Sequence, residues 1–233
     1  MPNWCDNHIF FYGYSDDVER LYRKIKTIST IKDMVSREIT PDFDNQNWLG
    51  TLALVMGFNV CGYKLISNSI IKTENEKDTD YPCRGQITSD INIEFDGDGG
   101  HLDFYYESAW APCDELMIAI AEKFNLDISQ MSEEPGCGLY KILDSNDEGG
   151  FFDDYDYVVD STETGIRYVS TESEACKLLR EAYDEHADCR NGVYDLINII
   201  REKHEDDWCS FNTFHREYVE LNKKEVDPFF GDI

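Results

Sequence analysis

The sequence predicts an α+β fold, with a ferredoxin-like split βαβ antiparallel sheet in residues 1–144 and a smaller, mostly helical part in residues 145–233. Residues 7–12 are rich in aromatic and β-branched side chains, and helical spacing follows them. Residues 91–106 alternate as a hairpin does, and helical spacing then returns at 116–124. The order strand, helix, strand, strand, helix, strand is that of the ferredoxin-like arrangement.

The first strand and helix are separated by a clear boundary. Gly13 ends the strand, and Ser15 is a good N-cap for the helix. The apolar positions of this helix are Val18, Leu21, Tyr22 and Ile25. Residues 29–85 interrupt the pattern, so we interpret them as an insertion. Within it, residues 49–58 fit a strand or a helix.

The next elements repeat the same alternation of strand and helix. Asp96-Gly-Asp-Gly-Gly100 is typical of a hairpin turn. Residues 144–149 resemble the start of a calcium loop and residues 96–103 are similarly acidic, but we interpret both stretches as turns. Pro112 suits the start of the second helix. Strands are predicted over 126–131 and 139–143, on either side of the turn that contains Glu134-Pro-Gly136.

The C-terminal part is predicted to contain a hairpin and three helices. The hairpin turns at residues 161–165. Thr171 and Glu174 fit a capping box at the start of the first helix, and a second helix covers 193–200. A third helix, capped by Ser210, is predicted from the spacing of Phe211, Phe214, Tyr218 and Leu221.

The charge of the chain restricts its partners. The formal net charge is −27, from 48 acids and 21 bases. Residues 1–40 carry 6 acids (Asp6, Asp16, Asp17, Glu19, Asp33, Glu38) and 6 bases (Arg20, Arg23, Lys24, Lys26, Lys32, Arg37), so the whole excess lies in residues 41–233. Direct contact with nucleic acid or an anionic membrane needs Lys and Arg, so we expect neither. A basic protein is the expected partner.

The richest acidic surface predicted from the sequence interleaves carboxylates with tyrosines. Acidic and aromatic side chains together can imitate phosphate and base, and tyrosines anchor protein interfaces. The predicted surface consists of Asp153, Asp154, Tyr155, Asp156, Tyr157 and Asp160. A second acidic cluster comprises Glu205, Asp206 and Asp207. The alternative interpretation is a solvated surface that keeps the protein soluble.

The eight cysteines include no Cys-x-x-Cys pair, and no apolar signal segment follows Met1. We therefore expect reduced thiols and a cytoplasmic protein without a membrane span or cofactor. Weak candidates for a zinc site are His186, Cys189, His204 and Cys209. A zinc-stabilised structural module is a third interpretation.

Four stretches carry a resemblance to a known family. They are Met1-Pro-Asn-Trp-Cys-Asp-Asn7, Asn59-Val-Cys-Gly-Tyr-Lys-Leu65, Glu107-Ser-Ala-Trp-Ala-Pro112 and Glu134-Pro-Gly136 with Gly138. Residues 1–144 resemble the YubB-type ferredoxin-like family of plasmid- and phage-encoded proteins. Cys61, Leu65 and Cys113 depart from the family pattern, in which two tryptophans and a proline stand there. The resemblance implies a fold and a mobile-element context.

The leading functional hypothesis is a non-enzymatic accessory protein of a mobile element. Its acidic surface would occupy the nucleic-acid channel of a basic host protein, such as a defence nuclease, and inhibit it. The alternative is a small-ligand-binding protein or enzyme. Its pocket would be formed by the family-motif residues Trp4, Cys5, Lys64 and Trp110. No catalytic residues are predicted.

Overall fold

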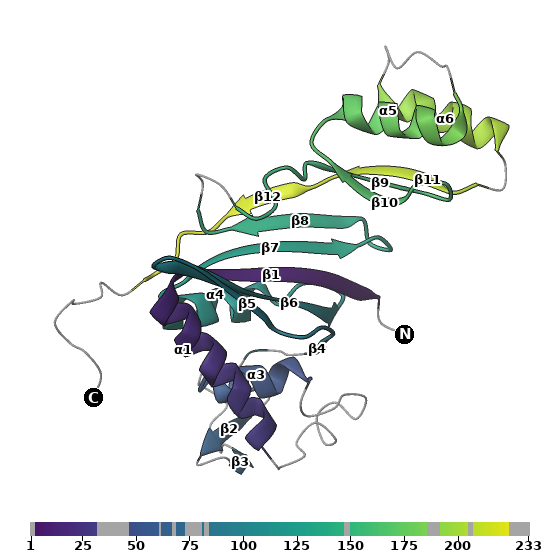
Figure 1. Cartoon of the computed structure of the whole chain (residues 1–233). Helices are drawn as coiled ribbons and strands as arrows, with labels where there is room; N and C mark the ends of the chain where they lie inside the picture. The colour runs from purple at the N-terminus through teal and green to yellow at the C-terminus, as the bar shows by residue number, and fades with distance from the viewer. Residues whose placement is uncertain are drawn as a thin grey trace.

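A seven-stranded sheet forms the centre of the molecule in the computed structural model (Figure 1). The structure describes residues 3–31, 47–60, 62–66, 69–72 (backbone), 81, 84–146, 150–185, 192–204 and 207–223. The strands of this sheet are β1 (Trp4–Tyr14), β4 (Gly85–Ile87), β5 (Asn92–Asp96), β6 (Gly99–Ala109), β7 (Asp127–Glu134), β8 (Leu139–Asp144) and β12 (His215–Tyr218).

The sheet order is β12-β8-β7-β1-β6-β4, and β5 pairs with residues 99–103 of β6 while β4 pairs with residues 106–108. Neighbouring strands are antiparallel except β12 and β8, which are parallel. Strand β1 lies between β6 and β7. Its side chains alternate between two faces, because successive residues of a strand point to opposite sides. Ile9 and Phe11 enter the main core, whereas His8, Phe10 and Tyr12 lie on the opposite face and are half-buried.

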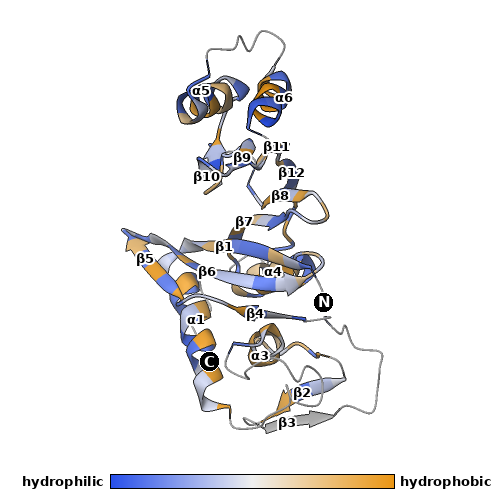
Figure 2. Cartoon of the chain, turned by 90° about the vertical axis from the view of Figure 1, so that its right-hand side faces the viewer, coloured by the Kyte–Doolittle hydropathy of each residue, from blue (hydrophilic) through white to orange (hydrophobic). Residues whose placement is uncertain are grey.

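Helices α1 (Ser15–Lys26) and α4 (Asp114–Phe124) cover the core face of the sheet (Figure 2). Both are amphipathic, and residues such as Leu21 and Met117 are fully buried against the strands. The prediction of Ser15 as N-cap was wrong by one position, since Tyr14 is the extended capping residue and Ser15 is already helical.

The predicted insertion contains short elements beside the two helices. They are the 3₁₀ turn η1 (Thr27–Thr30), helix α3 (Leu49–Val55) and the hairpin of β2 (Tyr63–Ile66) and β3 (Ser69–Lys72). The structure settles residues 49–55 as a helix. Every residue of α3 is buried, because it is apolar on all sides and packs near α1, η1 and β4.

The C-terminal part forms a small sheet covered by two helices at one end of the molecule (Figure 1). Strands β9 (Tyr157–Ser161), β10 (Gly165–Val169) and β11 (Cys209–Thr213) make a sheet in the order β10-β9-β11. Helices α5 (Glu172–Tyr183) and α6 (Val193–Lys203) pack on it. The predicted cap of α5 is confirmed: Thr171 Oγ1 accepts a hydrogen bond from Glu174 N at 3.2 Å.

The prediction of a third C-terminal helix was wrong, because Ser210, Phe211, Phe214, Tyr218 and Leu221 lie in or beside strands β11 and β12. Their helical spacing does not reflect one buried face, since their side chains serve different places. Phe211 enters the core of the small sheet, while Phe214 packs with Met131, Ile142 and Phe152. Tertiary pairing with β9 and β8 therefore overrides the periodicity.

Long apolar helices of the kind that cross a bilayer do not occur in the described part of the chain.

Candidate functional site: the acidic end of the sheet

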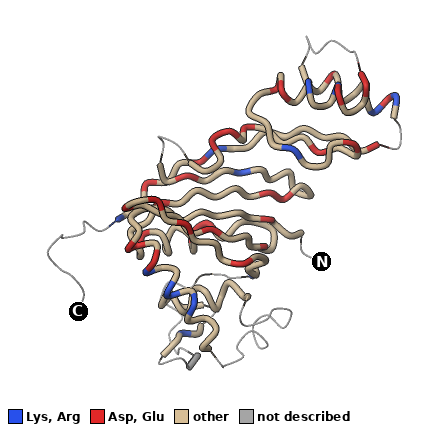
Figure 3. The backbone as a smooth tube through the Cα atoms, in the orientation of Figure 1, with Lys and Arg blue, Asp and Glu red and all other residues tan. Residues whose placement is uncertain are grey.

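The β5–β6 hairpin carries a dense group of exposed carboxylates. Glu94, Asp96 and Asp98 are all exposed, and no Lys or Arg lies between them in the sequence. Gly97 has a φ of 60°, which a tight turn requires and glycine adopts freely. The hairpin is anchored to the β1–α1 junction, because Ser15 N donates to the Asp98 carbonyl at 2.8 Å. Figure 3 shows acids gathered at this end of the sheet.

A second segment brings further acids to the same end. The Phe151 ring stacks on Phe10 with centroids 4.0 Å apart and an angle of 6° between the planes. Phe152 is buried on the same face, so the backbone between these rings and β9 is fixed in place. Asp153 and Asp154 follow directly and are exposed. We call the β5–β6 hairpin, residues 12–14, residues 125–127 and residues 150–154 the acidic end.

The negative charges of the acidic end act on the Tyr12 phenol. Its pKa is raised to about 12, first by burial and then by the negative charges of Asp127, Asp144 and Asp153. The negative charge of a phenolate is disfavoured where the local potential is already negative. The acidic end therefore favours cations.

Arg216 of β12 partly compensates these acids from one side. Its guanidinium lies 3.2 Å from Asp156, 3.8 Å from Asp153 and 3.7 Å from Asp144. The same side chain donates to the carbonyls of Phe152 and Asp153 at 2.9 Å. Arg216 thus fastens residues 152–156 to the main sheet.

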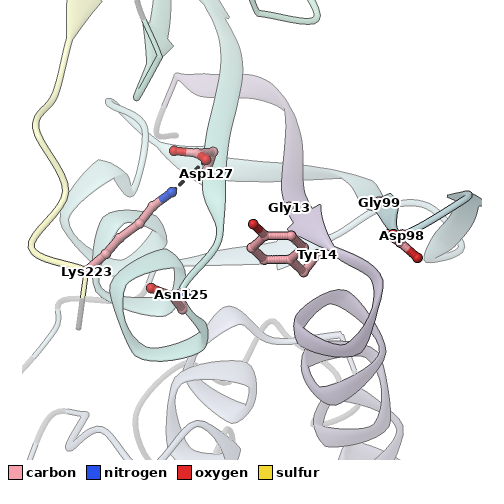
Figure 4. Close-up of a pocket in the computed structure, with 7 residues that line it drawn as sticks. All are labelled: Gly13, Tyr14, Asp98, Gly99, Asn125, Asp127 and Lys223. Atoms are coloured by element: carbon pink, nitrogen blue, oxygen red, sulfur yellow. Dashed lines mark ion pairs between the residues drawn. The ribbon is translucent and has the colours of Figure 1, made fainter. Parts of the chain in front are cut away.

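Two hollows adjoin at the acidic end and share Gly13 and Gly99. The first, which we call the lysine hollow, has a volume of about 470 Å³. It is lined by Gly13, Tyr14, Asp98, Gly99, Asn125, Asp127 and Lys223 (Figure 4). Lys223 Nζ lies 2.6 Å from Asp127 Oδ2, so the chain supplies its own ammonium group here. Figure 4 shows Tyr14 between this pair and Asp98.

The second, which we call the aromatic hollow, has a volume of about 400 Å³. It is lined by Tyr12, Gly13, Glu94, Phe95, Asp96, Gly99, Gly100, His101 and Phe151. The lining contains two carboxylates and several aromatic rings, and neither Lys nor Arg belongs to it. This arrangement suits an organic cation, which aromatic faces and carboxylates both attract.

The acidic and aromatic surface predicted from the sequence is divided by the structure. Asp153 and Asp154 belong to the acidic end, whereas Asp156 lies closer to Arg216, at 3.2 Å, than Asp153 does, at 3.8 Å. Asp160 accepts a hydrogen bond from Trp208 Nε1 at 3.1 Å on the small sheet. These carboxylates therefore do not all face one partner-accessible surface.

The tyrosines of that surface make internal contacts. Tyr155 stacks on Tyr168 and Tyr157 stacks on Phe211, each with centroids 5.1 Å apart. Of the second predicted cluster, Glu205 and Asp206 lie outside the described residues. Asp207 Oδ2 lies 3.7 Å from His204 Nδ1.

The four residues of the alternative pocket are not brought together. Trp4 and Trp110 are neighbours, since Trp4 pairs with Ala109 and Trp110 N donates to the Asn3 carbonyl at 2.9 Å. Lys64 lies on β2, which is separated from the start of β1 by α3 and β4 in both views (Figures 1 and 2).

Cys5 is poorly suited to act as a nucleophile. It is fully buried, and burial, followed by the charges of Asp6 and Asp114, raises the pKa of its thiol to about 12. The thiolate is the reactive form, and a buried thiol with a raised pKa rarely forms it.

The family-motif residues build one end of the sheet. Buried Asn7 donates to the Cys5 carbonyl at 2.8 Å and to Ser108 Oγ at 3.0 Å. Ser108 Oγ in turn donates to the Ala111 carbonyl at 2.8 Å, below Trp110. Glu134 accepts hydrogen bonds from the backbone N–H groups of its own turn. These contacts give the motifs a structural role, because they hold the strand ends and the exposed turn after Glu134 in place.

Of the weak zinc candidates, His186 and Cys189 lie outside the described residues. Cys209 is buried, and burial raises the pKa of its thiol to about 11. In the portion of the chain that the structure describes, no three His, Cys, Asp or Glu side chains are grouped as metal ligands.

Comparison with known proteins identifies one part of the chain. Residues 89–176 match the family model described as a ferredoxin-like domain in Api92-like protein. The chain contains a ferredoxin-like domain. The matched residues include the β5–β6 hairpin, Trp110 and residues 150–154 of the acidic end. No curated protein and no solved structure matches the chain.

Sequence reasoning missed most of the acidic end. The carboxylates of the β5–β6 hairpin were interpreted as turn residues, and Asp127 and Tyr14 were not selected. One signal was present in the sequence: residues 94–98 of the hairpin contain three acids and Phe95, and they contain no Lys or Arg. Their meeting with residues 150–154 depends on aromatic stacking across the sheet.

Proposed function

We propose that this chain is a non-enzymatic protein-binding module that engages a basic partner through its acidic end. The observation that carries the proposal is the convergence there of exposed carboxylates with exposed aromatic rings. Tyr14 and Phe151 are 71% and 41% exposed beside the carboxylates of the hairpin and of residues 153–154. Aromatic side chains anchor interfaces, and complementary charge directs and accelerates association.

The charge of the whole chain supports the same proposal. A protein of net charge −27 attracts basic proteins from a distance and repels nucleic acid. A partner whose basic surface normally holds a nucleic acid would find carboxylates in place of phosphates. Occupation of that surface would inhibit the partner. We propose that the partner is a host nucleic-acid-binding or defence protein, such as a nuclease.

The proposed biological context rests on the sequence motifs. The start of the chain and the Trp110 and Glu134 stretches resemble the YubB-type family of plasmid- and phage-encoded proteins. The order β7-β1-β6-β5, with α1 and α4 on one face, supports the finer assignment of a split βαβ arrangement. We accordingly place the protein in the host cytoplasm.

The test is an affinity capture with a matched pair of variants. One variant neutralises the acidic end with Asp96→Asn, Asp98→Asn, Asp153→Asn and Asp154→Asn. The control removes the same charge from exposed positions of the C-terminal part with Glu163→Gln, Glu172→Gln, Glu181→Gln and Glu202→Gln. Captured proteins are identified by mass spectrometry, and their nucleic-acid binding is measured with and without this protein.

The proposal requires a nucleic-acid-binding protein that the unaltered chain and the control capture but the acidic-end variant does not. This chain must also compete with nucleic acid for it, and added salt must weaken the complex, because salt screens exposed charges. Equal capture by both variants would show that net charge, and not the acidic end, is responsible. A partner that keeps its nucleic acid in the complex would rule out mimicry.

A further inference from the structure

The aromatic hollow has a composition that selects one kind of ligand. Tyr12 and His101 are paired across β1 and β6, and His101 is paired with Glu94 across β6 and β5. Directly paired residues point to the same face of a sheet. Their side chains therefore share the face that Phe151 covers, opposite helices α1 and α4. Asp96 lies two residues beyond Glu94 and follows the same side.

Phe151 is the aromatic residue of this hollow with the best-defined ring contacts. Phe10 covers one face of the ring at 4.0 Å, and Tyr12 and His101 meet it at 66° and 57°. Phe151 is nevertheless 41% exposed and lines the aromatic hollow, so part of it is open to a ligand. Ring faces carry negative electrostatic potential and attract cations.

The base of the hollow is formed by backbone. A Cβ at Gly99 would lie 3.6 Å from the carbonyl oxygens of Asp96 and Gly13, with no closer atom. The space above Gly99 is therefore open because no side chain fills it. A Cβ at Gly100 would instead lie 2.7 Å from the Glu94 carbonyl and the Phe95 ring.

The neighbouring lysine hollow provides an internal comparison. There the carboxylate of Asp127 is paired with Lys223 at 2.6 Å. The aromatic hollow contains the carboxylates of Glu94 and Asp96, and its lining supplies no Lys or Arg. His101 Nε2 approaches Glu94 only to 3.9 Å. One hollow thus contains its own cation, and the other has the groups to receive one.

We propose that the aromatic hollow binds the guanidinium group of an arginine side chain from the basic partner. This inference rests on the proposed function and names the residue type that it recognises. A guanidinium is planar, so it stacks on a ring such as Phe151 while its N–H groups donate to Glu94 and Asp96. An ammonium group can do only one of these well. Arginine is also among the residues that contribute most to interface affinity.

The experiment uses small probes, so it does not depend on knowing the partner. N-acetyl-arginine methylamide is titrated into the full chain, and binding is followed by the NMR shifts of the Gly99, Gly100 and Phe151 amides. The lysine analogue tests the preference for a guanidinium. The citrulline analogue, which is neutral and nearly the same shape, tests the need for charge. A single such contact predicts a dissociation constant of about 1–10 mM.

Three changes to the hollow test its parts. Phe151→Leu keeps an apolar side chain on Phe10 but removes the ring, and the dissociation constant should rise about fivefold. Glu94→Gln with Asp96→Asn should raise it by about as much. Gly99→Val puts a branched side chain into the base of the hollow and should raise the dissociation constant about tenfold or more. The matched controls, Tyr218→Leu and Glu163→Gln, alter an exposed ring and an exposed acid elsewhere and should have no effect.

The results separate this inference from the proposed function. The site is supported if arginine binds saturably and more tightly than lysine and citrulline, and if Gly99→Val weakens that binding about tenfold or more. The site is overturned if citrulline binds as tightly as arginine, or if Glu94→Gln with Asp96→Asn does not change the dissociation constant. These two substitutions are at exposed positions, so the fold should stay intact. No saturable binding up to about 50 mM also overturns the site, even if the acidic end still captures a partner. Binding of arginine without any captured partner would instead reject the proposed function alone.

Discussion

Arg216 offers the sharpest test of how the C-terminal part is held to the main sheet. Its side chain is only 22% exposed, and it lies 3.7 Å from the carboxylate of Asp144, whose side chain is 2% exposed. Arg216→Met keeps much of the apolar stem but removes the charge and the hydrogen bonds to residues 152–156. We expect the variant to lose stability and to loosen this segment.

The size of the loss follows from the burial of Asp144. Removing one partner of a fully buried ion pair costs about 3–5 kcal/mol. Arg216 is partly exposed, and Ser129 Oγ still donates to Asp144 Oδ1, so we expect about 2–3 kcal/mol at neutral pH.

The loss should depend on pH. Burial raises the pKa of Asp144, while the hydrogen bond from Ser129 and the charge of Arg216 lower it. Because the folded pKa is above the unfolded value, ionised Asp144 opposes folding. This cost is absent below the unfolded pKa and grows as the pH rises through the folded pKa. Removing Arg216 raises the folded pKa further, so the loss should be smaller at about pH 5 than at about pH 8.

Urea unfolding followed by tryptophan fluorescence measures this loss at both pH values. Lys177→Met, at an exposed position of α5, is the control and should change stability by less than about 0.5 kcal/mol. In an Asp144→Asn background the loss from Arg216→Met should shrink, because no buried charge remains. The same loss at both pH values and in both backgrounds would refute the electrostatic argument and leave packing as the cause.

Two further predictions concern the motif end of the sheet. Exposed Cys137 should react with iodoacetamide in the native protein. Cys5 and Cys113 should react only on unfolding, because burial raises their pKa values to about 12 and about 11. Labelling is read by mass spectrometry, and labelling of Cys5 in the native protein would contradict its burial. Asn7→Ala should lower the free energy of unfolding by about 2–3 kcal/mol, because it leaves buried hydrogen-bonding groups without their partner. The control, Asn198→Ala at an exposed position, should lower it by less than about 0.5 kcal/mol. Equal losses in urea unfolding would show that the hydrogen bonds of Asn7 are not stabilising.

Local chemistry was sufficient to predict the elements whose signals lie within one segment. The strand at residues 7–12, the helices at α1, α4, α5 and α6, and the two hairpins follow from periodicity, turns and caps. These features depend on residues close in sequence, so the sequence displays them directly. The motif that includes Asn7 was also recognisable, although its structural role became clear only from its buried partners.

Tertiary structure decided what depends on distant segments. Residues 209–218 have helical spacing, but the open edges of β9 and β8 bind them as strands. Lys64 lies on β2, which α3 and β4 separate from the end of the sheet where Trp4 and Trp110 lie (Figures 1 and 2). Arg216 pairs with Asp153 and Asp156, two acids of the predicted surface. The acidic end itself exists because Phe151 stacks on Phe10 and brings residues 150–154 beside the β5–β6 hairpin. The sequence by itself determined the number of charges and the local elements. Their positions were decided by packing, because burial and strand pairing act between residues whose separation along the chain carries no periodic signal.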